Sequence, residues 1–211
     1  MHQDASIARA AFQDGRRVWV RLIPEVVEDL GPDQHLLLDA VAEFEPLPRD
    51  AGREAARWLR ERALDEYGSS VTYLMLLDRQ IEAFYALTSA EVLLSGRDRK
   101  RIFKDVRENT YEVSPRQPAS LIAWAAKRAG AGEQCGELIL RHAFTSALEV
   151  AQNQGNIALV LDPFDEETAG MWMKMEAVKF RRSAEPRTGP DGSERIPRLW
   201  TPLHPPRKGF V

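Results

Sequence analysis

The feature that most constrains this sequence is a succession of three patterns between residues 119 and 154. The apolar stretch "ASLIAWAAKR" predicts a buried strand, and it is followed by a short segment with glycines at 130, 132 and 136. In "GELILRHAFTSALEVAQNQ" the apolar residues recur at intervals of three and four, which predicts an amphipathic helix. Unpaired amides at such a helix start can bind a phosphate. The glycine spacing matches neither the dinucleotide fingerprint nor a lysine-bearing phosphate loop, so a tight turn is an equally good interpretation.

The remaining patterns predict a sheet that carries helices. Ahead of the central succession we expect a strand at 18–23 ended by Pro24, a helix from an N-cap at Asp50 to Gly68, and a hairpin of "VTYLMLL" with "IEAFYALTSAEVLLS". After it we expect a strand in "NIALVLDPF", a helix opened by Asp165, and a hairpin of "VKFRRS" with "RIPRLWTPL". This order predicts an α/β (α+β) fold with a mixed, mainly antiparallel sheet flanked by helices.

Length and composition favour one globular domain. The chain has 211 residues, of which 44% are hydrophobic and 29% charged. We expect an N-terminal segment at 1–49 with a first strand and a short helix or turn after it, the main domain at 50–203 and a C-terminal tail at 204–211. A net charge of -3 gives no global reason to bind nucleic acid. The single cysteine, the absence of a signal-peptide pattern and the lack of an apolar run of about 18 residues predict a cytoplasmic protein without a membrane span.

The order and spacing of these patterns resemble the GNAT acetyltransferase superfamily, and within it the group that includes the tRNA-acetylating toxins. The resemblance covers roughly residues 58 to 203. It is carried by "WLRERALDEYGSSVTYLMLLDRQIEAFYALTSAEV", "PASLIAWAAKRAGAGEQCGELILRHA", "GNIALVLDP" and "ETAGMWMKM". These segments are similar to the family's helix and hairpin, its strand, pyrophosphate loop and helix, its next strand, and its last helix.

The resemblance implies an N-acyltransferase that moves an acetyl group from acetyl-CoA to an amine. It places the pantetheine arm against the main chain of Trp124, Ala125 and Ala126. It places the pyrophosphate on the amides of the loop that follows, formed by Gly132, Glu133, Gln134, Cys135 and Gly136. Because main-chain groups make these contacts, the identity of the side chains matters little.

Three departures from the family pattern support an alternative, a catalytically degenerate GNAT-fold module that binds or regulates a partner. The family's Q/R-x-x-G-x-G/A pattern falls on residues 131–136, where only the final glycine is kept, and Glu133 and Glu137 bring negative charge to the loop. The tyrosine that protonates the leaving thiolate in the family falls on or near Trp172, and an indole cannot supply that proton. Both hypotheses stay open on sequence alone.

Several other side chains are candidates for chemistry, each with an ordinary structural interpretation beside it. Tyr85 is a weak catalytic candidate or a cross-strand aromatic. Asp162 and Asp165 are candidate bases or helix-capping residues. Cys135 is a reactive thiol at a helix start or a small buried residue. His142 has no metal-ligand partner at a recognised spacing, so we expect an exposed helical histidine and no metal site.

The run "GRDRKRIFKDVR" is the main basic segment, and with Phe103 and Tyr111 nearby it suggests RNA contact at 97–107. A solvated connecting segment is the plainer interpretation of the same run. The acceptor amine carries no signature in the sequence. A homodimer and the presence of a partner gene are likewise left open.

Overall fold

The computed structural model describes residues 2–103, 113–186, 188, 192 and 194–203. The chain divides into two compact units, the first formed by Met1–Thr88 with Ala123–Ile139 and the second by Ser89–Ile122 with Leu140–Val211. Unit 1 contains α1 (His2–Asp14), β1 (Val18–Leu22), α2 (Pro24–Leu30), the 3-10 turn η1 (Gly31–Asp33), α3 (Gln34–Ala42), α4 (Asp50–Glu61) and β2 (Ser70–Leu77). Unit 2 contains α5 (Gly96–Phe103), β5 (Ala158–Leu161), α7 (Glu166–Lys174), β6 (Arg181–Arg182) and β7 (Leu199–Pro202).

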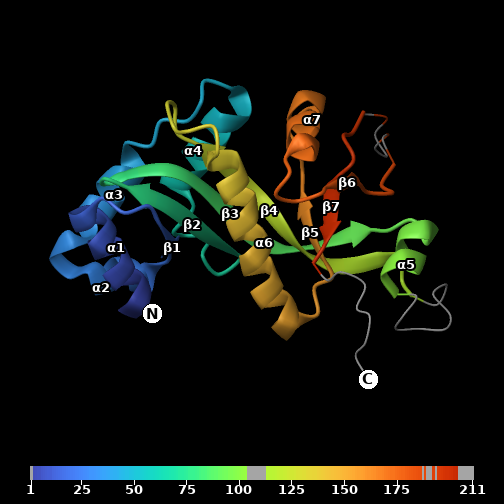
Figure 1. Cartoon of the computed structure of the whole chain (residues 1–211), viewed down its shortest axis with the longest axis horizontal. Helices are drawn as coiled ribbons and strands as arrows, with labels where there is room; N and C mark the ends of the chain where they lie inside the picture. Colours follow the sequence, from blue (N-terminus) through green and yellow to red (C-terminus); the bar gives the residue numbers. More distant parts are fainter. Residues whose placement is uncertain (1, 104–112, 187, 189–191, 193, 204–211) are drawn as a thin grey trace. The chain divides into compact units, whose positions relative to one another are not determined.

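Three elements pass from one unit into the other: β3 (Gln80–Leu93), β4 (Arg116–Lys127) and α6 (Cys135–Gln154). The strands are hydrogen-bonded in the order β1-β2-β3-β4-β5-β7-β6 (Figure 1). β4 and β5 run parallel, whereas β1–β2, β2–β3, β5–β7 and β6–β7 are antiparallel. The predicted α+β fold with a mixed, mainly antiparallel sheet is therefore confirmed.

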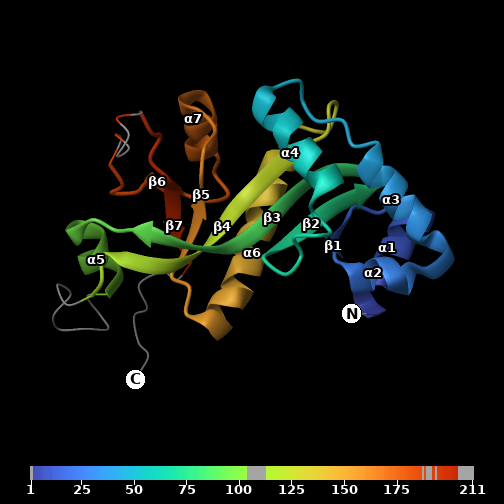
Figure 2. The same ribbon diagram turned by 180° about the vertical axis from the view of Figure 1, so that it is seen from behind.

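The core of unit 1 lies between helices α1–α4 and one face of the β1–β3 strands. Val20, Leu74 and Phe84 are cross-strand partners on this face, each with an exposure of 1% or less. α4 lies across the strands, as Figure 2 shows, and buries Trp58 and Leu59 against them. Burial of these apolar side chains, worth about 25 cal/mol per Å², makes a charged helix such as α4 stable in this position.

The β2–β3 hairpin has two irregularities that shape unit 1. Asp78 and Arg79 both have positive φ (48° and 65°), the geometry of a type I′ turn. Farther along, Met75 pairs with Ala83 but Leu76 pairs with Ile81, so Glu82 is an extra residue in a β-bulge. As a result the Glu82 carboxylate is buried in β3, where the other buried residues are apolar.

Unit 2 is built around the short, fully buried β5. Its residues pair in parallel with Ala119–Ile122 of β4 and in antiparallel with β7, from Ala158↔Pro202 to Leu161↔Leu199. Val160 and Trp200 lie in one cluster with Val92 and Ala119, against which Ile102 and Phe103 of α5 pack. The two ladders explain why so short a strand is stable.

Most predicted elements are present, with differences at their ends. The β1 strand, the β2–β3 hairpin, the helix opened by Asp165 and the final β6–β7 pairing are confirmed, although β6 and β7 are shorter than expected. The helix from residue 50 ends at Glu61 and continues as turns to residue 69. Arg49, not Asp50, is its N-cap, and Asp50 instead pairs with Arg53 in the first turn. Helices α1 and α3 lie in the N-terminal segment where we expected one short helix.

Candidate functional site

The candidate site is the part of unit 1 where β4 ends and α6 begins. The ladder between β4 and β5 extends over residues 119–122 of β4, and β4 then continues to Lys127. Trp124, Ala125 and Ala126, the residues expected to contact the pantetheine arm, all lie in this continuation and are half-buried. β4 therefore extends beyond its ladder with β5 at the three residues that were expected to contact the pantetheine arm.

The loop after β4 turns back on itself before α6 starts. The amide of Ala131 donates to the carbonyl of Arg128 at 3.1 Å, and Gly130 has a φ of 80°, which favours glycine. At the helix start the amide of Cys135 donates to the carbonyl of Gly132 at 3.1 Å. Gly132, Glu133 and Gln134 between these bonds are exposed.

The helix start presents main-chain donors, because the first amides of any helix lack partners within that helix. Within the part of the chain that the structure describes, the amides of Glu133, Gln134 and Gly136 have no hydrogen-bond acceptor. A Cβ atom built on Gly132 would meet nothing within 4 Å. The loop thus has open space beside a set of available donors, the arrangement that a phosphate requires.

The first residue of this loop, Arg128, forms an ion pair with a buried carboxylate. Glu82, the bulged residue of β3, is 5% exposed, and its carboxylate accepts from the guanidinium of Arg128 at the end of β4. The main chains of the two residues also meet, since the Arg128 amide donates to the Glu82 carbonyl at 2.8 Å. Sequence analysis did not identify this pair. Its only signal was a charged residue inside the otherwise apolar run "IEAFYAL".

The connection between α3 and α4 is joined to the same place. The Leu47 amide donates to the carbonyl of Lys127 at 3.2 Å, and the Ala129 amide donates to the carbonyl of Glu45 at 2.9 Å. Pro46, which lies between Glu45 and Leu47 in the sequence, forms an isolated antiparallel β-bridge with Arg128. We call the pair Glu82–Arg128, together with these main-chain bonds, the Arg128 node.

Three cations influence the start of α6. Arg17, Lys127 and Arg128 each act to lower the pKa of the Cys135 thiol, which means that they stabilise a negative charge at that position. Desolvation and the charge of Glu82 outweigh them, so the pKa of Cys135 is raised overall. Cys135 is 1% exposed and its thiol stays protonated at neutral pH, which removes the reactive-thiol interpretation. Of these three cations, Arg128 is paired with Glu82, so Arg17 and Lys127 are the two whose charge is left to oppose that of Glu133.

Comparison with known proteins relates the fold of this chain to that of two proteins of known structure, KacT and the toxin AtaT. No protein-family model and no curated protein matches the sequence. Among solved structures, a Tyr-to-Phe mutant of KacT is similar with a TM-score of 0.58 and 12% identity, over 77% of this chain and 87% of that chain. AtaT complexed with acetyl-methionyl-tRNAfMet is similar with a TM-score of 0.57 and 12% identity, over 77% and 86%. A mutant AtaT toxin bound to acetyl-CoA and to the C-terminus of the antitoxin AtaR gives 0.51 and 13%, over 77% and 85%.

The chain has the GNAT fold. At this level of identity the likeness establishes the architecture alone, and it agrees with the order of elements from which the resemblance was inferred. In this GNAT fold, β4, the loop at 128–134 and α6 have the order and connectivity expected of the family's strand, loop and helix.

The catalytic candidates of the sequence are held by structural contacts. Tyr85 is fully buried, stacks on Tyr73 at a centroid distance of 4.9 Å and meets the edge of Trp19 at 5.4 Å. In unit 2, Asp162 accepts two bonds from Arg198, at 2.6 and 2.7 Å. Trp172, where the family tyrosine was expected, is 7% exposed in α7. These positions favour packing and ion pairing over acid–base chemistry at Tyr85 and Asp162.

Asp165 is the N-cap of α7, and its removal should weaken that helix. Its carboxylate accepts from the Thr168 amide at 2.6 Å. We expect Asp165→Ala to lower the free energy of unfolding by about 1 kcal/mol, measured by urea denaturation. Asp165→Ser, which keeps an N-cap acceptor, should lose only a few tenths of that. Equal losses for both variants would show that the carboxylate acts in some way other than capping.

His142 of α6 is half-buried, not exposed as expected, and desolvation lowers its pKa from 6.5 to about 4. Between these two values the unfolded chain binds a proton that the folded chain does not. Stability from this group is therefore complete above about pH 6.5 and is lost as the pH falls toward about 4. We expect His142→Gln to flatten the decline of the melting temperature over this range. Parallel pH curves for the two proteins would contradict the prediction.

No group of metal-ligating side chains forms a cluster in the described part of the chain, and none of its helices is long and apolar enough to cross a membrane.

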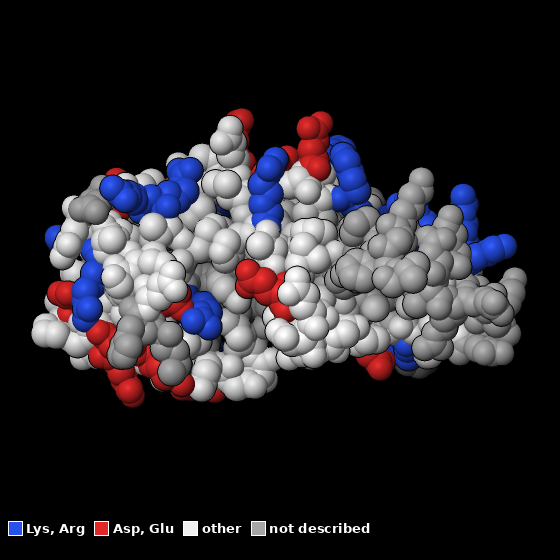
Figure 3. Space-filling model, turned by 60° about the horizontal axis from the view of Figure 1, so that its bottom comes forward, with Lys and Arg blue, Asp and Glu red and all other residues white. Residues whose placement is uncertain are grey.

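In α5 the side chains of Arg97, Lys100 and Arg101 are exposed, whereas Phe103 packs against the unit 2 core. Residues 104–107 and Tyr111 of the expected RNA-contact segment lie outside the described residues. The face that Figure 3 shows carries both acidic and basic side chains.

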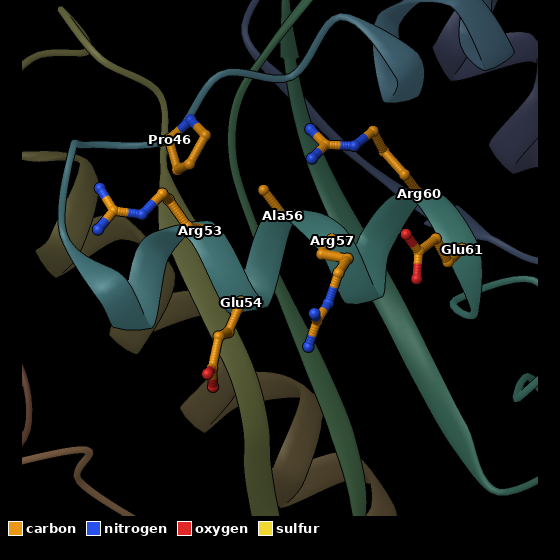
Figure 4. Close-up of a pocket in the computed structure, with 7 residues that line it drawn as sticks. All are labelled: Pro46, Arg53, Glu54, Ala56, Arg57, Arg60 and Glu61. Carbon is orange, nitrogen blue, oxygen red and sulfur yellow. The ribbon is translucent and has the colours of Figure 1, made fainter.

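A hollow of about 370 Å³ beside α4 is a second candidate for a ligand site. Figure 4 shows Arg60 extending toward Pro46, while Glu54 and Arg57 extend to the opposite side of the helix. Arg53 pairs with Asp50, and Arg60 donates to the carbonyl of Phe44 at 3.0 Å. The mixed charges and these local bonds indicate a solvated helix face and not a built pocket.

Proposed function

We propose that the chain is an acetyl-CoA-dependent N-acetyltransferase. One observation carries the proposal: in a GNAT fold, β4 continues beyond its ladder with β5 into a loop whose amides at 133, 134 and 136 lack acceptors among the described residues. The solved relatives support it, because AtaT was determined with acetyl-CoA and with an acetylated methionyl-tRNA.

The residues present fit the cofactor in three respects. Main-chain groups of Trp124, Ala125 and Ala126 would pair with the pantetheine arm, and the exposed loop amides would bind the pyrophosphate. The open space at Gly132 leaves room for phosphate oxygens. Arg17 and Lys127 would partly offset the charge of Glu133, whereas the charge of Arg128 is balanced by Glu82.

The proposed acetyl transfer requires little acid–base chemistry from the side chains of the protein. Acetyl-CoA, when bound, supplies an activated thioester whose carbonyl carbon the acceptor amine attacks. The C–S bond breaks, a C–N bond forms, and the amine gives up a proton while the departing sulfur gains one. Since Trp172 cannot donate that proton, we propose that water does so, which makes orientation by the main chain the chief contribution of the protein.

The experiment is a calorimetric titration of the purified chain with acetyl-CoA at low and moderate salt. We expect micromolar binding that weakens with salt, and about tenfold weaker binding for Gly132→Asp, which places a carboxylate in the open space at the loop. Gly68→Asp is the matched control, because a Cβ there also meets nothing within 4 Å. No binding by the wild-type chain would favour the alternative, a GNAT-fold module that acts through a protein partner.

A positive titration would be followed by an acceptor screen. Small amines, peptide N-termini and lysines, and charged tRNA are the three classes to compare, with transfer of labelled acetyl as the readout. We propose that charged tRNA is tested first, because the solved AtaT complex contains acetyl-methionyl-tRNAfMet. Transfer to a small amine alone would direct the search away from RNA.

A further inference from the structure

We infer that the Arg128 node is a positioning element that holds the 128–136 loop in the conformation that accepts a pyrophosphate. The inference rests on the proposed function. It assigns to Glu82 and Arg128 a role that the missing loop glycine leaves vacant, since Gln134 stands where the family pattern has a glycine.

Arg128 is attached to the loop and to its support at once. Its carbonyl accepts from Ala131 within the loop at 3.1 Å, and its amide donates to Glu82 on β3 at 2.8 Å. Its guanidinium pairs with the Glu82 carboxylate, whose side chain is 6% exposed. A shift of Arg128 would therefore move the first residue of the loop and break a buried pair.

The α3–α4 connection fixes the same point from another direction. The bonds from Leu47 to Lys127 and from Ala129 to Glu45 lie on either side of Arg128. Three segments that are far apart in sequence thus meet at one residue. Such a junction can hold the loop in one conformation even though the family's glycine pattern is incomplete. Hydrogen bonds to other segments fix the backbone there, so local glycines are not needed at every position.

The side chain of Arg128 is not itself a ligand in this view. One guanidinium nitrogen pairs with Glu82, another lies 3.4 Å from the carbonyl of Ala129, and Nε is buried without a partner among the described residues. The guanidinium thus contacts β3 and the start of the loop. We therefore assign it a positioning role.

The test compares four variants. Arg128→Lys keeps the charge but not the planar fork, and Glu82→Gln keeps the shape but not the charge. The double variant Glu82→Leu/Arg128→Met removes the pair without leaving a charge buried, so we expect it to fold. Arg53→Met is the control, because Arg53 is exposed and its ion pair is with Asp50 of the same helix turn.

Two measurements decide the matter. In hydrogen exchange without ligand, we expect the double variant to exchange at least about tenfold faster at the hydrogen-bonded amides of the node and its loop, with α1 unchanged. These amides are those of Leu47, Arg128, Ala129 and Ala131. In titrations, we expect it to bind acetyl-CoA about tenfold more weakly and S-acetylpantetheine, which lacks the pyrophosphate, equally well. Arg128→Lys should fall between it and the wild-type chain, and Arg53→Met should match the wild-type chain.

The outcomes separate this inference from the proposed function. Unchanged loop exchange, or equal weakening of both ligands, would overturn the positioning role while leaving an acetyl-CoA-binding protein. Failure of the wild-type chain to bind either ligand would overturn the proposed function and with it the pyrophosphate role. Exchange would still show whether the node holds the loop.

Discussion

Replacing Arg128 with alanine is expected to lower the free energy of unfolding by about 3 kcal/mol, because the substitution leaves the Glu82 carboxylate buried without its partner. Glu82 is 5% exposed, so its carboxylate has little contact with water to compensate for the lost guanidinium. The value lies at the lower end of the range for buried pairs, since the Arg128 side chain retains 30% of its exposure. Urea denaturation of the variant and the wild-type chain measures the difference.

Glu82→Leu/Arg128→Met is the control for this prediction. With both charges gone, neither is left without a counter-ion, and we expect the double variant to recover most of the loss, to within about 1 kcal/mol of the wild-type chain. The shortfall reflects imperfect packing at the β-bulge. A loss below about 1 kcal/mol for Arg128→Ala would indicate that solvent already screens the pair.

Trp58→Ala should cost about 3–5 kcal/mol, the range for removing a large aromatic side chain from a core. Trp58 is 4% exposed, packs in the core of unit 1, and stacks on Trp124 of β4 with centroids 5.6 Å apart. The substitution leaves a cavity beneath β4 and removes the aromatic contact to Trp124. Chemical denaturation gives the change in stability.

Trp58→Phe is the matched variant. It keeps an aromatic ring against Trp124 but loses the indole N–H, which donates to Glu66 at 2.9 Å. We expect a loss of about 1–2 kcal/mol, the sum of a smaller cavity and one lost hydrogen bond to a charged group. If the two variants lost the same stability, the ring stack would contribute nothing and the indole hydrogen bond would account for the whole effect.

The central part of the fold was predictable because its signals are periodic. The apolar run ending at Lys127 and the helical spacing after Gly136 each span enough residues to indicate one structure, and both elements are present. α1 was harder to predict. Its buried positions Ala5, Ala8 and Ala11 have helical spacing, but alanines give little contrast between a polar and an apolar face.

The Arg128 node could not be predicted from the sequence. A β-bulge depends on how two strands align, so nothing local to "IEAF" distinguishes a bulged Glu82 from a solvent-facing one. Its partner is 46 residues away, at the end of another strand. The loop itself was located from its glycines, whereas the residues that support it became visible only through tertiary contacts.

The buried position of Cys135 has a practical consequence. It is the only cysteine of the chain, and it occupies the first turn of α6, directly after the loop. A thiol reagent in solution reaches Cys135 only when that turn opens, so the rate of modification measures the rate of opening of the first turn of α6. This rate can be followed by absorbance in the native protein and in every variant that keeps the cysteine.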